Sequence, residues 1–266
     1  MKICCCIFST NRIPYLTRTL ESQKLLDFLG CDVSRILIDD YPKNRDDMAL
    51  IELASTHGYN EMRLHGENLS IGATWCEFFN LIKDRDYDFV WHQEDDCVIL
   101  ESINIRMLID FLQGTPNASQ IVLKRQPWYS HETPSESLDD DLIHGPFRGE
   151  FNAAKYYFTP ICSLYRMEHV RFDYWKWYQD HYPHEPIWQN TNPNEAFLGK
   201  VLIEGFGLQS LHVKNREGKN LIAHIGEFTT GRRLLPHEPG YETFAKYDPE
   251  QRYYSATGKP YPQEVL

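Results

Sequence analysis

The sequence contains no long hydrophobic run. Its longest apolar stretch near the start, residues 3–8, falls far short of the roughly 18 residues that a transmembrane helix requires. The same stretch is too short for the core of a signal peptide, and no cleavage-like site follows it. These absences predict a soluble protein that stays in the cytoplasm and has no membrane partner.

Paired cysteine motifs are missing as well. The chain has seven cysteines, of which Cys4, Cys5 and Cys6 are adjacent, but no Cys-x-x-Cys pair. This excludes a zinc knuckle and a thioredoxin-like motif. We expect reduced thiols that pack as small apolar residues.

Basic charge is scarce, with 27 Lys and Arg against 38 Asp and Glu and a net charge of −11. A chain of this charge gains little from a nucleic-acid backbone unless it carries a local basic patch. Several phosphate and hydrolase motifs are also lacking. There is no Gly-x-Gly-x-x-Gly fingerprint, no Walker-type Gly-Lys-Ser/Thr, no Gly-x-Ser-x-Gly elbow and no His-Glu-x-x-His pair.

The chain has 266 residues, of which 42% are hydrophobic and 24% are charged. This composition is typical of a globular protein. In the first half, apolar runs typical of buried strands alternate with helical patterns. Strands are predicted at 2–8, 34–38, 62–64, 87–91 and 121–123, and helices at 14–30, 45–57, 72–83 and 105–114. This alternation predicts an α/β fold with a mostly parallel, Rossmann-like sheet flanked by helices.

The second half is less regular. Residues 126–149 are predicted to form one long polar loop, and a Pro- and Tyr-rich tail from 235 is expected to wrap the surface. Between them we expect an extended segment at 156–166, a helix at 194–204 ended by Gly205, and strands at 208–213 and 221–225. We find no linker or repeat, so residues 1–266 are interpreted as one domain with parts at 1–125, 126–234 and 235–266.

Three acidic residues, Glu94, Asp95 and Asp96, follow the predicted strand at 87–91; we call them the acidic triplet. Ligands of open α/β sheets bind at the carboxyl ends of strands. Adjacent carboxylates repel one another, and a hard divalent ion with phosphate and water as further ligands relieves that repulsion. The triplet therefore predicts a metal site. A solvated acidic turn is the alternative interpretation.

Other candidate residues surround the same predicted strand ends. Asp39 or Asp40 could accept a hydrogen bond from a ribose or a base, and the turn of Ser9, Thr10, Asn11 and Arg12 opens a helix, where backbone N–H groups favour phosphate. Helix capping explains the aspartates equally well.

Glu195, in the first turn of a predicted helix, is a candidate general base, although the helix dipole alone would account for an acid there. His224 could ligate a metal such as Mn²⁺, and Arg232 and Arg233 could neutralise a diphosphate. A buried histidine beside a solvated basic loop is the alternative.

The order of these parts resembles the GT-A glycosyltransferases, and within them the family 2-like enzymes. The matching features are the turn at 9–12, the acids at 39–40, an Asn-x-x-x-Gly element at Asn68 and Gly72, and the triplet in place of Asp-x-Asp. In the second half, residues 123–128, 158–166, 194–197 and 224–226 resemble glycosyltransferases of tailed bacteriophages, which would place the protein in the host cytoplasm. The triplet departs from the family pattern by having Glu first, and Asp96 is then the expected metal contact beside Glu94.

This resemblance implies a metal-dependent transfer of a sugar from a nucleoside-diphosphate sugar, with UDP as the expected nucleotide, to an acceptor hydroxyl. The metal would be Mn²⁺ or Mg²⁺, and Glu195 would act as the base of an inverting reaction. Residues 1–125 would bind the nucleotide sugar and residues 126–234 the acceptor. A virion protein, a glycan and a hydroxylated DNA base all remain open as acceptors.

Two alternatives stay open at this point. A sugar-nucleotide nucleotidyltransferase would share the sheet and the metal acids, but it would want a Gly-rich phosphate loop that residues 9–15 do not provide. A non-catalytic carbohydrate-binding module could instead use Trp175, Trp177, Tyr178 and Trp188 as stacking platforms. It would need neither metal nor nucleotide.

Overall fold

The computed structural model describes residues 1–40, 45–67, 70–126, 142–151, 158–159, 161–171, 180 and 193–225. The predicted tail at 235–266, the four aromatic residues at 175–188, and Asn68, Arg232 and Arg233 lie outside this part of the chain. Within it, no helix is long and apolar enough to cross a membrane.

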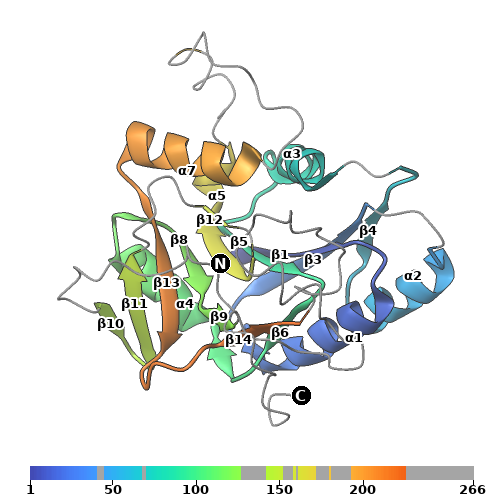
Figure 1. Cartoon of the computed structure of the whole chain (residues 1–266), viewed down its shortest axis with the longest axis horizontal. Coiled ribbons are helices and arrows are strands. Elements are labelled where there is room, and N and C mark those ends of the chain that lie inside the picture. Colours follow the sequence, from blue (N-terminus) through green and yellow to red (C-terminus); the bar gives the residue numbers. More distant parts are fainter. Residues whose placement is uncertain are drawn as a thin grey trace, which may run out of the picture.

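A nine-stranded sheet organises the molecule, with the strand order β10-β11-β13-β8-β12-β5-β1-β3-β4 (Figure 1). Neighbours β1, β3, β4 and β5 are parallel, β8 and β13 are parallel, and β12 runs antiparallel between β5 and β8. The strands are β1 (Lys2–Ser9), β3 (Asp32–Asp39), β4 (Glu61–Leu64), β5 (Phe89–Glu94), β8 (Ala118–Leu123), β10 (Leu142–His144), β11 (Phe147–Phe151), β12 (Ser163–Arg166) and β13 (Gln209–Asn215).

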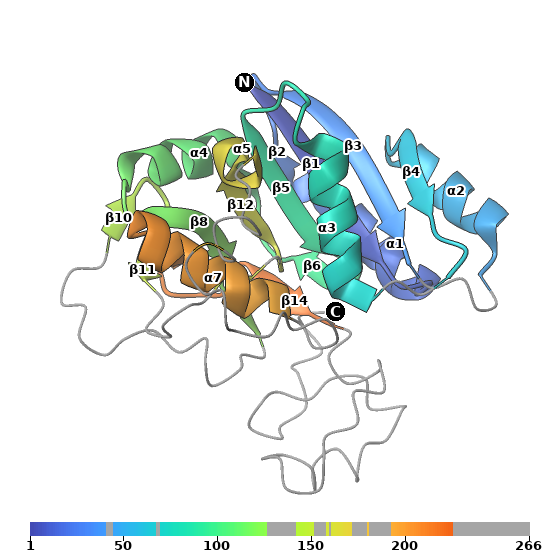
Figure 2. The same cartoon turned by 90° about the horizontal axis from the view of Figure 1, so that it is seen from above.

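Helices cover both faces of this sheet (Figures 1 and 2). Helices α1 (Ile13–Ser22), α2 (Asp47–Thr56) and α4 (Ile105–Gly114) pack on the face that carries Ile3, Cys5 and Ile7. Helices α3 (Ser70–Ile82), α5 (Met167–Arg171) and α7 (Pro193–Phe206) cover the opposite face. Because β1 is buried on both faces, its sequence is a continuous apolar run without alternation.

Two small sheets complete the described part. One has the order β6-β14-β9, with β6 (Cys97–Ile99), β14 (Ile222–His224) and β9 (Arg125–Gln126). The other pairs β2 (Leu26–Asp27) with β7 (Ile103–Asn104). The first of them matters for function, because β6 begins directly after the acidic triplet.

Three sequence-based boundaries were wrong. The helix predicted at 14–30 ends at Ser22 and is followed by a short 3-10 helix, η1 (Gln23–Leu25), because the next residues pair with β7 instead of continuing the helix. The loop predicted at 126–149 contains the hairpin of β10 and β11, which turns at Gly145 with φ of 58°. Helix α7 passes through Gly205 and ends before Gly207, whose φ of 68° suits a helix C-terminus.

Candidate active site

The candidate site lies where three parallel strands end side by side. Their register pairs Ser9 of β1 with Asp39 of β3, and Phe8 of β1 with Glu94 of β5. Ser9, Asp39 and Glu94, the last residues of these strands, are therefore neighbours at one edge of the sheet, which we call the carboxyl edge. Three of the sequence-predicted segments thus meet at the place where ligands of open α/β sheets bind.

Asp95 is the internal anchor of the acidic triplet. Its Oδ2 accepts hydrogen bonds from Ser9 Oγ at 3.3 Å, from the Thr10 backbone N–H at 3.0 Å and from Arg12 Nε at 3.2 Å. Only 1% of Asp95 is exposed. Its carboxylate therefore ties the acidic triplet to the turn after β1 and has little surface left for a ligand.

Arg12 places a fixed cation inside the acidic triplet. Its guanidinium contacts both oxygens of Asp95, and its Nη1 lies 2.7 Å from Asp96 Oδ2. Burial lowers the pKa of Arg12, but the carboxylates of Asp96 and Asp95 outweigh this effect and raise it above its usual value. Burial also raises the pKa of Asp95, and the charge of Arg12 opposes that rise.

Asp39 is likewise engaged within the protein. Its Oδ2 accepts the backbone N–H of Asn11 at 2.7 Å, and its Oδ1 pairs with Arg45 Nη1 at 2.9 Å. Asn11 adopts a left-handed backbone with φ of 58°, a conformation that asparagine tolerates better than most residues. The N–H groups of Thr10 and Asn11, expected to face phosphate, thus donate to Asp95 and Asp39.

Asp40 differs from its neighbour. Its Oδ2 accepts a hydrogen bond from Thr74 Oγ1 of α3 at 3.1 Å, while its Oδ1 has no hydrogen-bond donor in the described part of the chain. Burial raises the pKa of this carboxyl, which is only 7% exposed. Of the two aspartates after β3, Asp40 therefore has the oxygen without a donor in the described part of the chain, and that oxygen is itself buried.

Glu94, Asp96 and Cys97 form the one metal-compatible group among the described side chains, with candidate ligand atoms all within 4.8 Å of one another. Burial raises the pKa of the Cys97 thiol well above its usual value, and sulfur is a soft ligand that hard divalent ions disfavour. The two carboxylates remain, and oxygen is what Mg²⁺ and Mn²⁺ prefer. The residues present thus fit a divalent ion, and the metal assignment stays a prediction.

His224 and Glu195 are placed by their backbones only. In the β6–β14 pair, His224 lies opposite Cys97, and the N–H of Ile225 donates to the Asp96 carbonyl at 2.8 Å. Glu195 lies in the first turn of α7, as predicted, and Gly72 lies in the first turn of α3. The side chains of His224 and Glu195 lie outside the described part, and their roles stay predictions.

Sequence reasoning missed the support behind the acidic triplet. Three polar side chains of α1 and η1 hold the segment from residue 95 to 99. Thr19 Oγ1 donates to the Asp95 carbonyl at 2.8 Å, and Ser22 Oγ accepts the Ile99 N–H at 3.0 Å. Gln23 Nε2 donates to Gln93 Oε1 at 3.0 Å, and Gln93 Nε2 donates to the Cys97 carbonyl at 2.6 Å.

The signal for this support is weak in the sequence. Gln93 has no solvent exposure although it is polar, and it lies in β5 just before the acids, beyond residue 91 where the strand was predicted to end. A polar residue in such a position needs internal partners. The sequence shows this need but not the partners, because Gln23 and Gln93 are far apart along the chain.

A buried ion cluster at the end of β8, which β12 separates from β5, was also missed. Lys124, directly after β8 and only 3% exposed, donates to Glu150 Oε2 at 2.9 Å, and Lys214 donates to the other oxygen of Glu150. Burial lowers the pKa of Lys124. Burial tends to raise the pKa of Glu150, but hydrogen bonds from Lys214 and Lys124 outweigh it and lower the pKa. The cluster joins β11 and β13 to the end of β8.

No protein-family model and no curated protein sequence matches this chain. Solved structures do match it. S. aureus TarS 1-349 aligns with a TM-score of 0.50 at 15% identity, covering 84% of this chain and 60% of that one. The same fragment in complex with UDP aligns with a TM-score of 0.50 at 13% identity and the same coverage. This chain thus spans about 60% of the TarS 1-349 structures and 29% of a longer TarS structure.

A further match is weaker. The mannosyltransferase PcManGT from Pyrobaculum calidifontis, in complex with GDP-Man and Mn²⁺, aligns with a TM-score of 0.36 at 13% identity over 47% of this chain and 36% of that one. The TarS 1-349 alignments establish the fold. The chain has a GT-A type α/β fold with a mostly parallel sheet between two layers of helices, and the predicted fold class is confirmed.

Proposed function

We propose that this chain is a glycosyltransferase that moves a sugar from a nucleoside-diphosphate sugar, with UDP as the nucleotide, to an acceptor hydroxyl. One observation carries the proposal. Glu94 and Asp96 lie within metal-binding distance of each other at the carboxyl edge. The fold shared with a UDP-bound protein supports it.

In this proposal, the chain's own residues divide the work. Asp40 accepts a hydrogen bond from the nucleoside, and Asp39, Asp95 and Ser9 hold the turn of Thr10, Asn11 and Arg12 in place. Asn68 and Gly72 follow from the family resemblance as further donor contacts. Arg232 and Arg233 are assigned the role of offsetting the charge of the diphosphate.

The carboxylates of Asp96 and Glu94, with His224 as a nitrogen ligand, would hold Mn²⁺ or Mg²⁺. When bound, such an ion supplies positive charge that stabilises the departing diphosphate. Glu195 accepts the proton of the acceptor hydroxyl, whose oxygen attacks the sugar from the side opposite the diphosphate. The reaction therefore inverts the anomeric configuration.

Thermal melts test the donor part of this proposal. UDP with Mn²⁺ should stabilise the protein, by about 2.7 kcal/mol at 100 times the dissociation constant. Asp96→Asn should abolish this shift, while Asp110→Asn, a change at an exposed ion pair on α4, should keep it. If no nucleoside diphosphate shifts the melt with either metal, the proposal is wrong. A panel of nucleotide sugars with Mn²⁺, read out by mass, then identifies the donor.

A further inference from the structure

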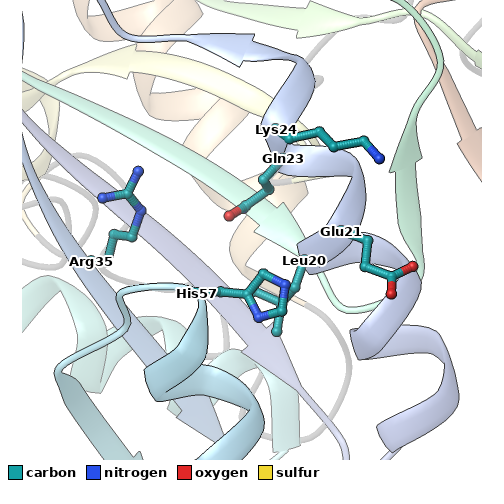
Figure 3. A pocket seen from close by; sticks show the side chains of 6 residues that line it. All are labelled: Leu20, Glu21, Gln23, Lys24, Arg35 and His57. Atoms are coloured by element: carbon teal, nitrogen blue, oxygen red, sulfur yellow. The ribbon is translucent and has the colours of Figure 1, made fainter.

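A cleft lies on the α1–α2 face, away from the carboxyl edge. It measures about 520 Å³ and is lined by Leu20, Glu21, Gln23, Lys24, Arg35 and His57. Figure 3 shows Arg35 of β3 at the left, Gln23 and Lys24 of η1 near the centre and to the right, and His57 below Gln23. Arg35 precedes Asp39 by four residues, about 13 Å along a strand, so the cleft is separate from the candidate active site.

Positive charge gathers around this cleft in a chain that is otherwise strongly acidic. Arg35 is half-buried, and neither it nor Lys24 forms a salt bridge in the described part of the chain. Most other arginines there, such as Arg12, Arg45 and Arg85, pair with carboxylates. Two cations without a carboxylate partner in the described part of the chain thus line one cleft, where Glu21 is the one acidic lining residue.

Three polar groups around the cleft, those of Arg35, Gln23 and His57, are held in place before any ligand binds. Arg35 lies over the Phe28 ring, 5.8 Å from its centroid. Gln23 Oε1 accepts the hydroxyl of the buried Tyr59 at 2.9 Å, and one N–H of its amide is taken by Gln93. Since an amide has two N–H donors, the second remains for the cleft. His57 is fixed through Nδ1, which donates to the Leu53 carbonyl at 3.0 Å.

We propose that this cleft is a second ligand site, for a small molecule that carries a carboxylate or phosphate group. The planar fork of Arg35 matches either group with two parallel hydrogen bonds. Lys24 adds a point charge, Gln23 adds a neutral donor, and Leu20 supplies an apolar wall. Donor side chains that are already fixed lose little conformational entropy when a ligand binds. The flexible side chains of a solvated basic surface lose more, and this difference distinguishes the cleft from such a surface. The proposal does not depend on the transferase function.

Calorimetric titration of the whole chain with citrate and, separately, with inorganic phosphate tests the site and separates the two chemistries. The unmodified protein should bind at least one probe saturably, with one site per chain, and NMR should show the His57 ring resonances shifting with the same dissociation constant. Arg35→Gln and Lys24→Gln should each weaken binding about tenfold or more. Lys24 is exposed, so its substitution leaves folding intact even if Arg35→Gln does not.

Two controls locate the binding. Arg63→Gln, on the exposed neighbouring strand β4, should leave the affinity unchanged, and Asp96→Asn should do the same if the probe binds away from the acidic triplet. The proposal is overturned if neither probe binds. It is also overturned if Lys24→Gln and Arg35→Gln both keep the original affinity, or if Asp96→Asn removes the binding.

Discussion

The guanidinium of Arg12 contacts the carboxylates of both Asp95 and Asp96. The repulsion within the acidic triplet, which suggested a metal ion from the sequence alone, is therefore partly relieved by a residue of the chain itself. Glu94 and Asp96 still group at metal-binding distance. Charge repulsion within the acidic triplet is therefore not sufficient evidence for a metal ion. The short distance between the carboxylates of Glu94 and Asp96 is the evidence that supports one.

Removing the charge of Arg12 should destabilise the fold. Arg12→Gln leaves Asp95 buried with no cation, and breaking a buried pair in this way costs about 3–5 kcal/mol. Arg12→Lys should lower the free energy of unfolding by less, because lysine keeps the positive charge and loses only the paired N–H donors of the guanidinium. Urea unfolding measures both. Arg106→Gln, at an exposed pair with Asp110, is the control and should change stability by less than about 1 kcal/mol. Equal losses in Arg12→Gln and Arg106→Gln would contradict the anchoring role.

Gln93 should affect nucleotide binding although it lies behind the acids. Gln93→Leu leaves the Cys97 carbonyl without its donor, which costs about 1–3 kcal/mol, and loosens the segment that carries Asp96. Metal-dependent UDP binding, measured by calorimetry, should weaken several-fold. Thr115→Val removes a buried hydrogen bond at the end of α4 and should cost similar stability without touching UDP affinity. If both variants bind UDP alike, Gln93 does not position the site.

Glu195 and His224 should be separable by what their substitution damages. Glu195→Gln keeps shape but cannot accept a proton, so UDP binding should survive while turnover falls roughly 10²–10⁴-fold. His224→Ala should instead weaken binding of UDP with Mn²⁺. Near-normal turnover of Glu195→Gln, or a loss of donor binding as severe as that of His224→Ala, would remove the base assignment and favour a retaining reaction.

Acid stability should report on the cluster around Glu150. Its pKa in the folded protein lies below the ordinary value of 4.5, so its stabilising contribution is present above that pH and is lost as pH falls through the lower folded value. The free energy of unfolding should therefore fall less steeply below pH 4.5 in Glu150→Gln than in the unmodified protein. Glu217→Gln should change the slope much less, because solvent screens the attraction within its exposed pair with Lys219. Identical slopes for the two variants would refute this account.

The fold class could be predicted from the sequence because the local sequence patterns of the strands and helices match the burial of those elements in the structure. A strand buried on both faces, such as β1, must be apolar throughout, and Pro14 and Gly114 stand at helix ends, where their backbone preferences place them. The hairpin of β10 and β11 was missed although Gly145 precedes a proline at its turn. The polar run before Leu142 hid that signal, because the loop predicted from that run extends through the turn.

The sequence placed the acids at strand ends but could not divide their roles. Asp39 and Asp40 are adjacent, yet Arg45 and Asn11 engage the first, while Thr74 donates to only one oxygen of the second. Such differences depend on partners that only the folded chain brings together. The roles of Asp95 and Gln93 were unpredictable for the same reason.

Strand β12 has a consequence for how the chain is made. It fills the gap between β5 and β8, yet it follows both in the sequence. A growing chain therefore carries two buried-type strands with open edges until Ser163–Arg166 leaves the ribosome. At about 5–20 residues per second, this stage lasts for seconds. Open strand edges invite pairing with other chains, so nascent chains that stop before β12 should aggregate, and chaperones that shield strand edges should raise the yield of the complete protein.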